Sequence, residues 1–215
     1  MPRKQLIHEN PAMEAERQTP RQILEAAEDL FLSKGFKGVS MKEVADVVQI
    51  TPAALYYHFP NGKQDLFVQM IKMVIGEWIK GAQKAMQPAT TLRERLLLLT
   101  QHLLTLPLEQ FRLLMRDVQE CLPDQEQRMA VKRAGWRLTQ LLVDVLQPAI
   151  DAGEIEAALP APVLASLYQG MCTTLLHTRT FAPEWTEQMD TDQLAQHVVS
   201  VLLDGIASPP SRPYR

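Results

Sequence analysis

Residues 51–59, TPAALYYHF, combine small, hydroxyl and aromatic side chains in one short segment. Thr51-Pro52 is typical of a helix start, because the Thr oxygen caps backbone N–H groups and Pro fits the first helical position. Leu55 and Phe59 stand four residues apart, so one face of this helix is predicted to lie against the core. The other faces carry side chains of modest size, which suits a helix that enters the DNA major groove, about 12 Å wide. The segment therefore predicts contacts with the edges of base pairs.

Two more helices are predicted ahead of this segment. The first begins at Thr19-Pro20, presents an apolar stripe and ends at Gly35. The second begins at Ser40, because Ser followed three residues later by Glu has the spacing of a capping box. The turn Gln49-Ile50 then leads into residues 51–58. Three helices in this order, with the last two joined by a tight turn, form a helix-turn-helix pattern.

A longer ordered pattern runs through residues 23–66: Ile23-Leu-Glu-Ala-Ala, Leu30-Phe31, Gly35-Phe36, Ser40, Val44-Ala45, Ile50-Thr51, Leu55-Tyr-Tyr-His-Phe59, Lys63 and Leu66. In order, spacing and residue type it resembles the N-terminal signature of TetR-type regulators. The resemblance implies an all-α fold of about nine helices, in which an N-terminal helix-turn-helix domain precedes a ligand-binding and dimerisation domain. It also implies a homodimer that binds a double-stranded DNA operator and responds to a small-molecule effector. Beyond residue 70 the resemblance is architectural only.

The resemblance assigns roles to single positions. Four positions match the groove-facing surface of the recognition helix, two match usual phosphate contacts, and Lys63 matches a lysine that pairs with the DNA backbone. Gln49 stands where the family usually has Gly, so the turn is expected to be strained and Gln49 is a candidate contact with DNA. Asn61-Gly62 makes the loop before Lys63 one residue longer than the common pattern. The candidate DNA-binding residues are Ser40, Lys42, Gln49, Thr51, Pro52, Ala53, Tyr56, Tyr57, His58 and Lys63.

The groove-facing positions hold no Arg, Asn or Glu, so side chains for bidentate base readout are missing. Pro52, Ala53 and Ala54 are suited to thymine methyl groups, and Tyr57 adds a hydroxyl or a stacking face. We therefore expect an operator that is recognised through thymine methyls and DNA shape. Residues 1–66 hold eight Lys or Arg and nine Asp or Glu, a net of −1. The prediction of DNA binding therefore depends on motif geometry rather than on overall charge.

Helical periodicity continues after residue 62. A helix is expected from about Lys63 to the mid-80s, followed by helices over 91–105, 107–120, 123–151, 160–178 and 191–206. Pro148 is expected to kink or shorten the helix that contains it. The predicted domains are 19–66 for DNA binding and 67–206 for ligand binding and dimerisation. They are flanked by a disordered arm, 1–18, and a disordered tail, 207–215.

The last two helices have apolar faces that the resemblance assigns to a four-helix bundle between subunits. The alternative is that these faces are buried within one chain. The candidate interface residues are Leu164, Leu167, Met171, Leu175, Leu194, Val198, Val201 and Leu202. Gly170 would allow a close approach of helices.

The helices that precede this bundle are expected to enclose an effector pocket. Methionine adapts to irregular apolar ligands, so a lipophilic effector is predicted. For each candidate, a role in the plain hydrophobic core is the alternative. The candidates are Met70, Trp78, Phe111, Met115, Trp136, Tyr168, Cys172 and His177.

Other classes of function find little support in the sequence. No HExxH, GxSxG or Gly-rich phosphate loop is present, so an enzyme is not expected. Cys121 and Cys172 are isolated, which predicts no metal site, no cofactor and a reducing cytoplasm. No apolar run is long enough to span a membrane. The expected function is a repressor that an effector releases from its operator. An activator and a helical carrier of apolar ligands that binds no DNA remain alternatives.

Overall fold

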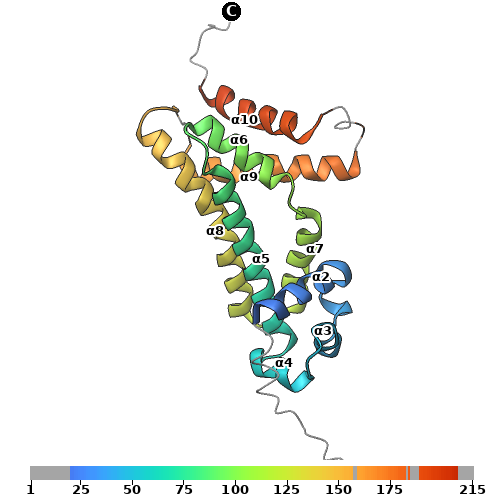
Figure 1. Cartoon of the computed structure of the whole chain (residues 1–215). Helices are drawn as coiled ribbons and strands as arrows, with labels where there is room; N and C mark the ends of the chain where they lie inside the picture. The colour runs from blue at the N-terminus through green and yellow to red at the C-terminus, as the bar shows by residue number, and fades with distance from the viewer. Residues whose placement is uncertain (1–19, 157–158, 183, 185–188, 208–215) are drawn as a thin grey trace, which may run out of the picture. The chain divides into compact units, whose positions relative to one another are not determined.

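The structure is a computed structural model that describes residues 20–156, 159–182, 184 and 189–207. These residues form nine α-helices and no strand, as the all-α prediction requires (Figure 1). The predicted arm, the Thr19 cap and residues 208–215 of the predicted tail lie outside the described residues. The helices are α2 (Pro20–Gly38), α3 (Met41–Val47), α4 (Pro52–His58), α5 (Lys63–Met86), α6 (Leu92–Leu103), α7 (Leu108–Cys121), α8 (Gln125–Asp151), α9 (Ala161–Phe181) and α10 (Thr191–Ala207).

The chain divides into two compact units. The first unit comprises the described residues up to Val74 together with Gln110–Val131. It therefore holds α2, α3, α4, the first half of α5, most of α7 and the start of α8. The second unit comprises Ile75–Glu109 and the described residues from Lys132 onward. The predicted functional boundary between residues 66 and 67 stays a prediction.

Aromatic rings form the centre of the first unit. The ring of Phe67 on α5 lies 4.8 Å from that of Phe31 and 4.9 Å from that of Phe36, both on α2. Phe31 and Phe67 are fully buried, and burial of a Phe side chain contributes roughly 1.5–3 kcal/mol. Leu55 of α4 and Phe59, which follows its last residue, are also fully buried, which confirms the predicted inner face of that helix. This shared core holds the three N-terminal helices against the start of α5.

Local signals place the helix ends. The Ser40 hydroxyl accepts a hydrogen bond from the Glu43 N–H at 3.1 Å, and Thr51 caps α4 through the Ala54 N–H at 3.2 Å. Gly35 has φ 67° and ψ 174°, so the first straight segment of α2 ends there as predicted. Pro148 was expected to kink or shorten its helix. It does not shorten α8, which continues to Asp151. Pro148 lies exposed in the last turn, where water can hydrate the carbonyl that a proline leaves unbonded.

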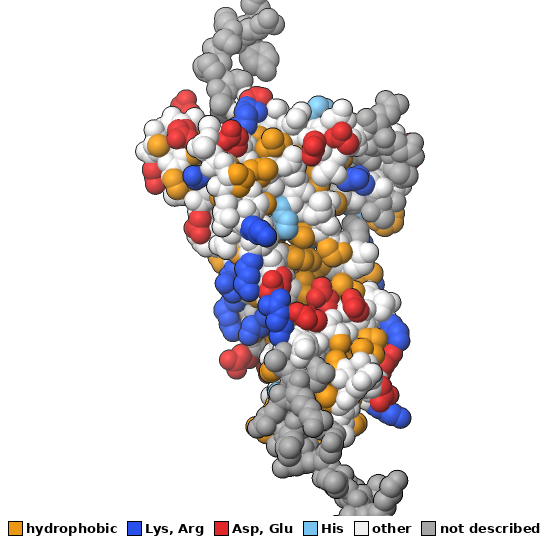
Figure 2. Space-filling view, in the orientation of Figure 1, with side chains coloured by type: hydrophobic (Ala, Val, Ile, Leu, Met, Phe, Trp, Pro, Cys, Tyr) orange, Lys and Arg blue, Asp and Glu red, His pale blue; other side chains and the backbone are white. Residues whose placement is uncertain are grey.

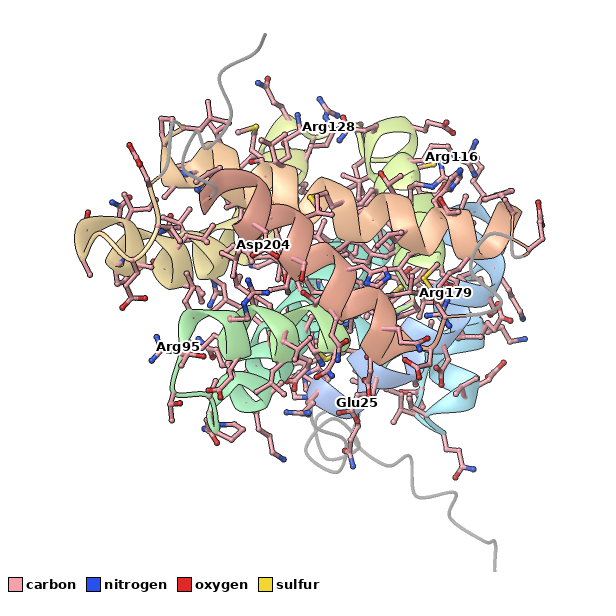
Figure 3. All side chains as sticks on the ribbon, turned by 90° about the horizontal axis from the view of Figure 1, so that it is seen from above. Glu25, Arg95, Arg116, Arg128, Arg179 and Asp204 are labelled. Carbon is pink, nitrogen blue, oxygen red and sulfur yellow. The ribbon has the colours of Figure 1, made fainter. Side chains whose placement is uncertain are left out.

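In the second unit, α10 packs across α6 and α9, as the view from above shows (Figure 3). Arg93 on α6 forms an ion pair with Asp204 on α10 at 2.6 Å, and the Gln101 amide donates to Asp192 at 3.0 Å. Leu194 of α10 is buried in a cluster with Leu104. Apolar burial is the main attachment of α10, because exposed ion pairs contribute only about 0–1 kcal/mol each. None of the described helices is long and apolar enough to cross a membrane.

Candidate nucleic-acid interface

The outer surface of α4 carries most of the predicted groove-facing residues. Thr51, Pro52, Ala53 and Tyr57 are exposed, and Tyr57 leaves 67% of its surface open. An exposed aromatic ring of this size next to buried Leu55 is available for a partner. The remaining predicted DNA contacts differ in exposure: Ser40, Lys42, Gln49 and Tyr56 are exposed, whereas His58 and Lys63 are half-buried.

One part of the predicted readout is wrong. Ala54 is fully buried, so its methyl group cannot contact a thymine. The apolar spacing of α4 suggested a single inner stripe at Leu55 and Phe59. In the folded unit Ala54 also lies inside, because neighbouring helices cover more than one row of a short helix. Pro52, Ala53 and Tyr57 remain as candidate contacts with base edges.

The turn between α3 and α4 has the conformation that the sequence suggested. Gln49 has φ 58°, and it is the only non-glycine with positive φ among the described residues. Its N–H donates to the Asp46 carbonyl at 3.3 Å, and the Ile50 N–H donates to the Ala45 carbonyl at 3.0 Å. This pair of bonds is a Schellman motif, in which glycine usually takes the left-handed position. The predicted strain at Gln49 therefore has a specific backbone basis, whereas its contact with DNA stays a prediction.

The extra residue in the loop before α5 is accommodated by a second left-handed position. Gly62 has φ 70°, and its N–H donates to the Phe59 carbonyl at 2.8 Å. A Cβ at Gly62 would lie 3.4 Å from the ring of Tyr56. The Asn61-Gly62 insertion thus folds tightly under Tyr56 and leads directly into Lys63.

Lys63 is not directed freely into solvent. Its ammonium lies 4.4 Å from the centroid of the Phe36 ring. Partial burial lowers the pKa of Lys63, and the charges of Cys121 and Asp117 on α7 oppose that shift. The predicted contact of Lys63 with DNA phosphate stays a prediction, and it requires a phosphate to compete with this ring.

Asp117 is a functional candidate that the sequence analysis missed. It is 8% exposed, and its carboxylate accepts a hydrogen bond from the Phe36 N–H at 2.6 Å. The available signal was an acidic residue on the apolar stripe of α7, between buried Leu114 and Val118. Such a position indicates a buried carboxylate, but not its partner. The sequence analysis also missed the ion pair of Lys34 with Glu43, which joins α2 to α3 and holds the pKa of Glu43 below its usual value.

Positive charge also gathers on residues that were not predicted to contact DNA. Figure 2 shows Lys and Arg side chains clustered along α8. The exposed basic residues of α8 in the second unit are Lys132, Arg133 and Arg137. The described residues contain no group of three or more His, Cys, Asp or Glu placed to bind a metal ion.

The predicted effector-pocket residues are divided between the two units. Met70, Phe111 and Met115 belong to the first unit, and the other five belong to the second. Trp136 is 56% exposed and His177 is also exposed, so both lie on the surface of the chain. Because apolar spacing cannot distinguish an inner face from an outer one, these two positions were overinterpreted as parts of an enclosed pocket.

Two of the predicted pocket residues are part of a hydrogen-bonded core. The Tyr168 hydroxyl lies 2.5 Å from the Thr100 hydroxyl and donates to the Leu96 carbonyl at 3.1 Å. Burial raises the pKa of Cys172 to about 12. An open depression of about 280 Å³ on the second unit has a different lining, made of Gln83, Met86, Gln87, Ala89, Arg95 and Val145.

Half of the predicted dimer residues are buried within the chain. Leu164, Leu194, Val198 and Leu202 are at most 5% exposed, so the within-chain alternative is correct for them. They fill the core between α9, α10 and their neighbours and cannot form an outer surface. Met171 and Leu175 are half-buried, and only Leu167 and Val201 of the predicted set are exposed.

Comparison with known proteins agrees with the helix-turn-helix. Residues 23–70 match the family described as bacterial regulatory proteins, tetR family. The chain is 21% identical over 195 residues to the fatty acid metabolism regulator protein of Bacillus subtilis, which covers 90% of this chain and 98% of that protein. It is 29% identical over 75 residues to the HTH-type transcriptional activator FasR of Mycolicibacterium smegmatis. That match spans about a third of each protein, 35% of this chain and 34% of FasR.

Solved structures share the fold at low sequence identity. FadR from Bacillus subtilis in complex with stearoyl-CoA has a TM-score of 0.69 and 20% identity, covering 87% of this chain and 100% of that one. AibR in complex with isovaleryl coenzyme A and operator DNA has a TM-score of 0.62 and 22% identity, covering 86% and 97%. Residues 23–70 therefore form a DNA-binding domain of the tetR family type, and the chain shares the fold of solved transcriptional regulators.

Proposed function

We propose that this protein is a dimeric repressor that binds operator DNA through α4 and is released by a fatty acyl thioester of coenzyme A. The observation that carries the DNA-binding part is the two-sided character of α4. Leu55 and Phe59 are fully buried, while Pro52, Ala53 and Tyr57 are exposed. A helix anchored on one side, with small residues and one tyrosine on the other, suits the major groove.

The choice of effector follows from two proteins of the same fold, which were solved with stearoyl-CoA and isovaleryl coenzyme A. The second unit of this chain offers a compatible mixture of surfaces. Its open depression combines apolar Met86 and Val145 with the charged side chain of Arg95. An acyl-CoA pairs an apolar chain with phosphate groups, so it can use both kinds of contact. Release from DNA then requires only that the effector prefer a conformation other than the DNA-binding one.

The dimer is proposed to form through the outer faces of α9 and α10. Leu167 is 52% exposed on α9, and Val201 is 65% exposed on α10. Val163, one turn before Leu167, extends the same apolar face. A Cβ at Gly170 would meet nothing within 4 Å, so this face leaves room for the helix of a second copy. A dimer would place two α4 helices about 34–36 Å apart, one turn of DNA.

The first experiment is a selection of bound duplexes from a random library with the full-length chain. The mass of the complex and the affinity as a function of salt are then measured on the enriched site. We expect a near-palindromic sequence, two chains per site, and an affinity that falls steeply with salt. Pro52→Ala and Tyr57→Ala are expected to change the base preference. Unchanged preference in both variants would refute readout by this face.

Effector specificity is tested on the same duplex with stearoyl-CoA, using coenzyme A and stearate as matched controls. The proposal predicts release by the thioester and little release by either half. Operator binding that no acyl-CoA weakens would leave the DNA-binding role intact and refute the effector. Tighter binding with stearoyl-CoA would refute release as the mode of regulation. A library without any enriched sequence would favour the carrier that binds no DNA.

A further inference from the structure

Among the charged residues that the structure describes, only Asp117 is buried. Its carboxylate on α7 accepts the Phe36 N–H at 2.6 Å, across 81 positions of sequence. A carboxylate out of water is costly unless it is hydrogen-bonded or close to positive charge. The bond to Phe36 is therefore a strong, charge-assisted contact between α7 and α2.

The backbone of α2 is shaped around this carboxylate. Gly35, just before Phe36, has φ 67° and ψ 174°, a conformation that side chains rarely allow. A Cβ at Gly35 would lie 3.1 Å from Oδ2 of Asp117, closer than most such contacts. The interruption in α2 thus directs the Phe36 N–H at Asp117 and leaves space for its oxygen.

The ring of Phe36 also contacts a cation. The Lys63 ammonium lies 4.4 Å from the centroid of the Phe36 ring, at a distance typical of a cation–π contact. Burial lowers the pKa of Lys63, and Cys121 and Asp117 on α7 both oppose this shift. One residue, Phe36, therefore binds a carboxylate through its N–H and an ammonium through its ring.

We propose that Asp117 is a positioning residue that retains Lys63 on Phe36 and so restrains it from binding DNA phosphate. The inference rests on the proposed DNA-binding function, together with the predicted contact of Lys63 with phosphate. The ring and the carboxylate compete with a phosphate for one ammonium, so their attraction lowers the affinity for the operator. Because Asp117 belongs to α7, a shift of α7 away from Phe36 would release the lysine. Operator affinity then depends on the position of a helix outside the helix-turn-helix.

The test compares the wild-type chain with Asp117→Asn, Lys63→Ala and the double variant. Asn keeps an oxygen that can accept the Phe36 N–H, but it removes the negative charge of the carboxylate. Asp117→Asn is expected to tighten operator binding about three- to tenfold, a range typical of one weak charge interaction in each protomer. The slope of log affinity against log salt should steepen by up to about 0.9 for each released lysine. In the Lys63→Ala background, Asp117→Asn should change neither the affinity nor the slope.

The position of Lys63 is followed separately by NMR in the absence of DNA. Its side-chain methylene protons should show ring-current shifts in the wild-type chain, and these should decrease in Asp117→Asn. Phe36→Leu provides a second variant, because it removes the ring and keeps an apolar side chain. It should tighten operator binding in the same direction as Asp117→Asn.

Each outcome separates this inference from the proposed function. If the wild-type chain binds no operator, the proposed function fails, and an unchanged Lys63 shift in Asp117→Asn overturns the restraint as well. If the wild-type chain binds, then unchanged affinity in a folded Asp117→Asn overturns the inference alone. A gain that persists in Lys63→Ala also overturns it. Should Asp117→Asn fail to fold, unchanged affinity in Phe36→Leu has the same meaning.

Discussion

Replacement of Gln49 by glycine should stabilise the protein through its backbone alone. Gln49 occupies the left-handed position of the Schellman motif that ends α3, with φ 58°. Chain geometry offers an internal comparison, because Gly153 holds the same position after α8, with φ 70°. There the Gly153 N–H donates to Ile150 at 3.1 Å and the Glu154 N–H donates to Ala149 at 2.9 Å. The two turns share one geometry but differ in the residue that adopts it.

The magnitude follows from two opposing costs. A side-chain-bearing residue in the left-handed region costs roughly 1–2 kcal/mol, whereas glycine loses roughly 0.5–1 kcal/mol more conformational entropy on folding. Gln49→Gly should therefore raise the free energy of unfolding by about 0.5–1 kcal/mol. For a chain of this size the melting temperature should rise by about 1–4 °C. Gly153→Ala should lower it by a similar amount, and no atom within 4 Å would clash with the new Cβ.

Thermal and urea unfolding of the two variants measure this effect, with Gln49→Ala as the matched control. Alanine removes the Gln side chain but keeps the Cβ and hence the strain, so its stability should stay near that of the wild type. Operator affinity is measured in parallel. If the Gln49 side chain contacts DNA, both variants lose that contact, and their affinity for the operator should fall equally. If Gln49→Ala stabilised the protein as much as Gln49→Gly, backbone strain could not be the cause. A Gln49→Gly variant that unfolds more easily than the wild type would also refute the reasoning.

Three further predictions concern the second unit and the duplex. Gly81→Ala should be less stable than Gly76→Ala by about 1–3 kcal/mol, as is typical of overpacking, in paired melting curves. Both sites are in α5, but a Cβ at Gly81 would lie 2.6 Å from the His102 ring, whereas one at Gly76 meets nothing within 4 Å; equal stabilities would show that the ring moves aside freely. Cys172 should resist iodoacetamide at pH 8 in the folded chain, because burial raises its pKa to about 12 and leaves little thiolate. Mass spectrometry of its peptide should show labelling only after unfolding, and rapid labelling of the native chain would contradict the buried position. In the selection experiment, Ala53→Gly should weaken thymine preference without changing the salt slope, since a methyl group is lost and no charge changes.

Local features of the chain were predictable from the sequence. Ser40 and Thr51 begin helices because their hydroxyls reach N–H groups three residues further along. Gly35 interrupts α2, as a glycine at the end of an apolar stripe indicated, and Gln49 adopts the left-handed turn at the position where the resemblance places a glycine. Such features depend on interactions within about five residues, so the amino-acid order contains nearly all the information they need. The all-α fold followed because helical periodicity persists along the chain.

Tertiary structure decided which apolar surfaces are inside. Leu164 and Leu194 were expected at the dimer interface but fill the chain's own core, while Trp136 was expected in a pocket and lies on the surface. Periodicity shows that a helix has an apolar face, but it does not show which neighbour covers that face or whether one row of residues is covered or two. Ala54 is buried for the same reason.

The contact between Asp117 and Phe36 was beyond sequence reasoning for a different reason. The two residues are 81 positions apart, and the bond uses a backbone N–H that carries no signature in the amino-acid order. The placement of Lys63 over the Phe36 ring likewise depends on how α2 and α5 meet. The sequence alone therefore determined the helices, their caps and the family of the DNA-binding motif. Only the packing of distant helices decided which side chains remain free to bind a partner, because burial depends on neighbours that the local sequence does not contain.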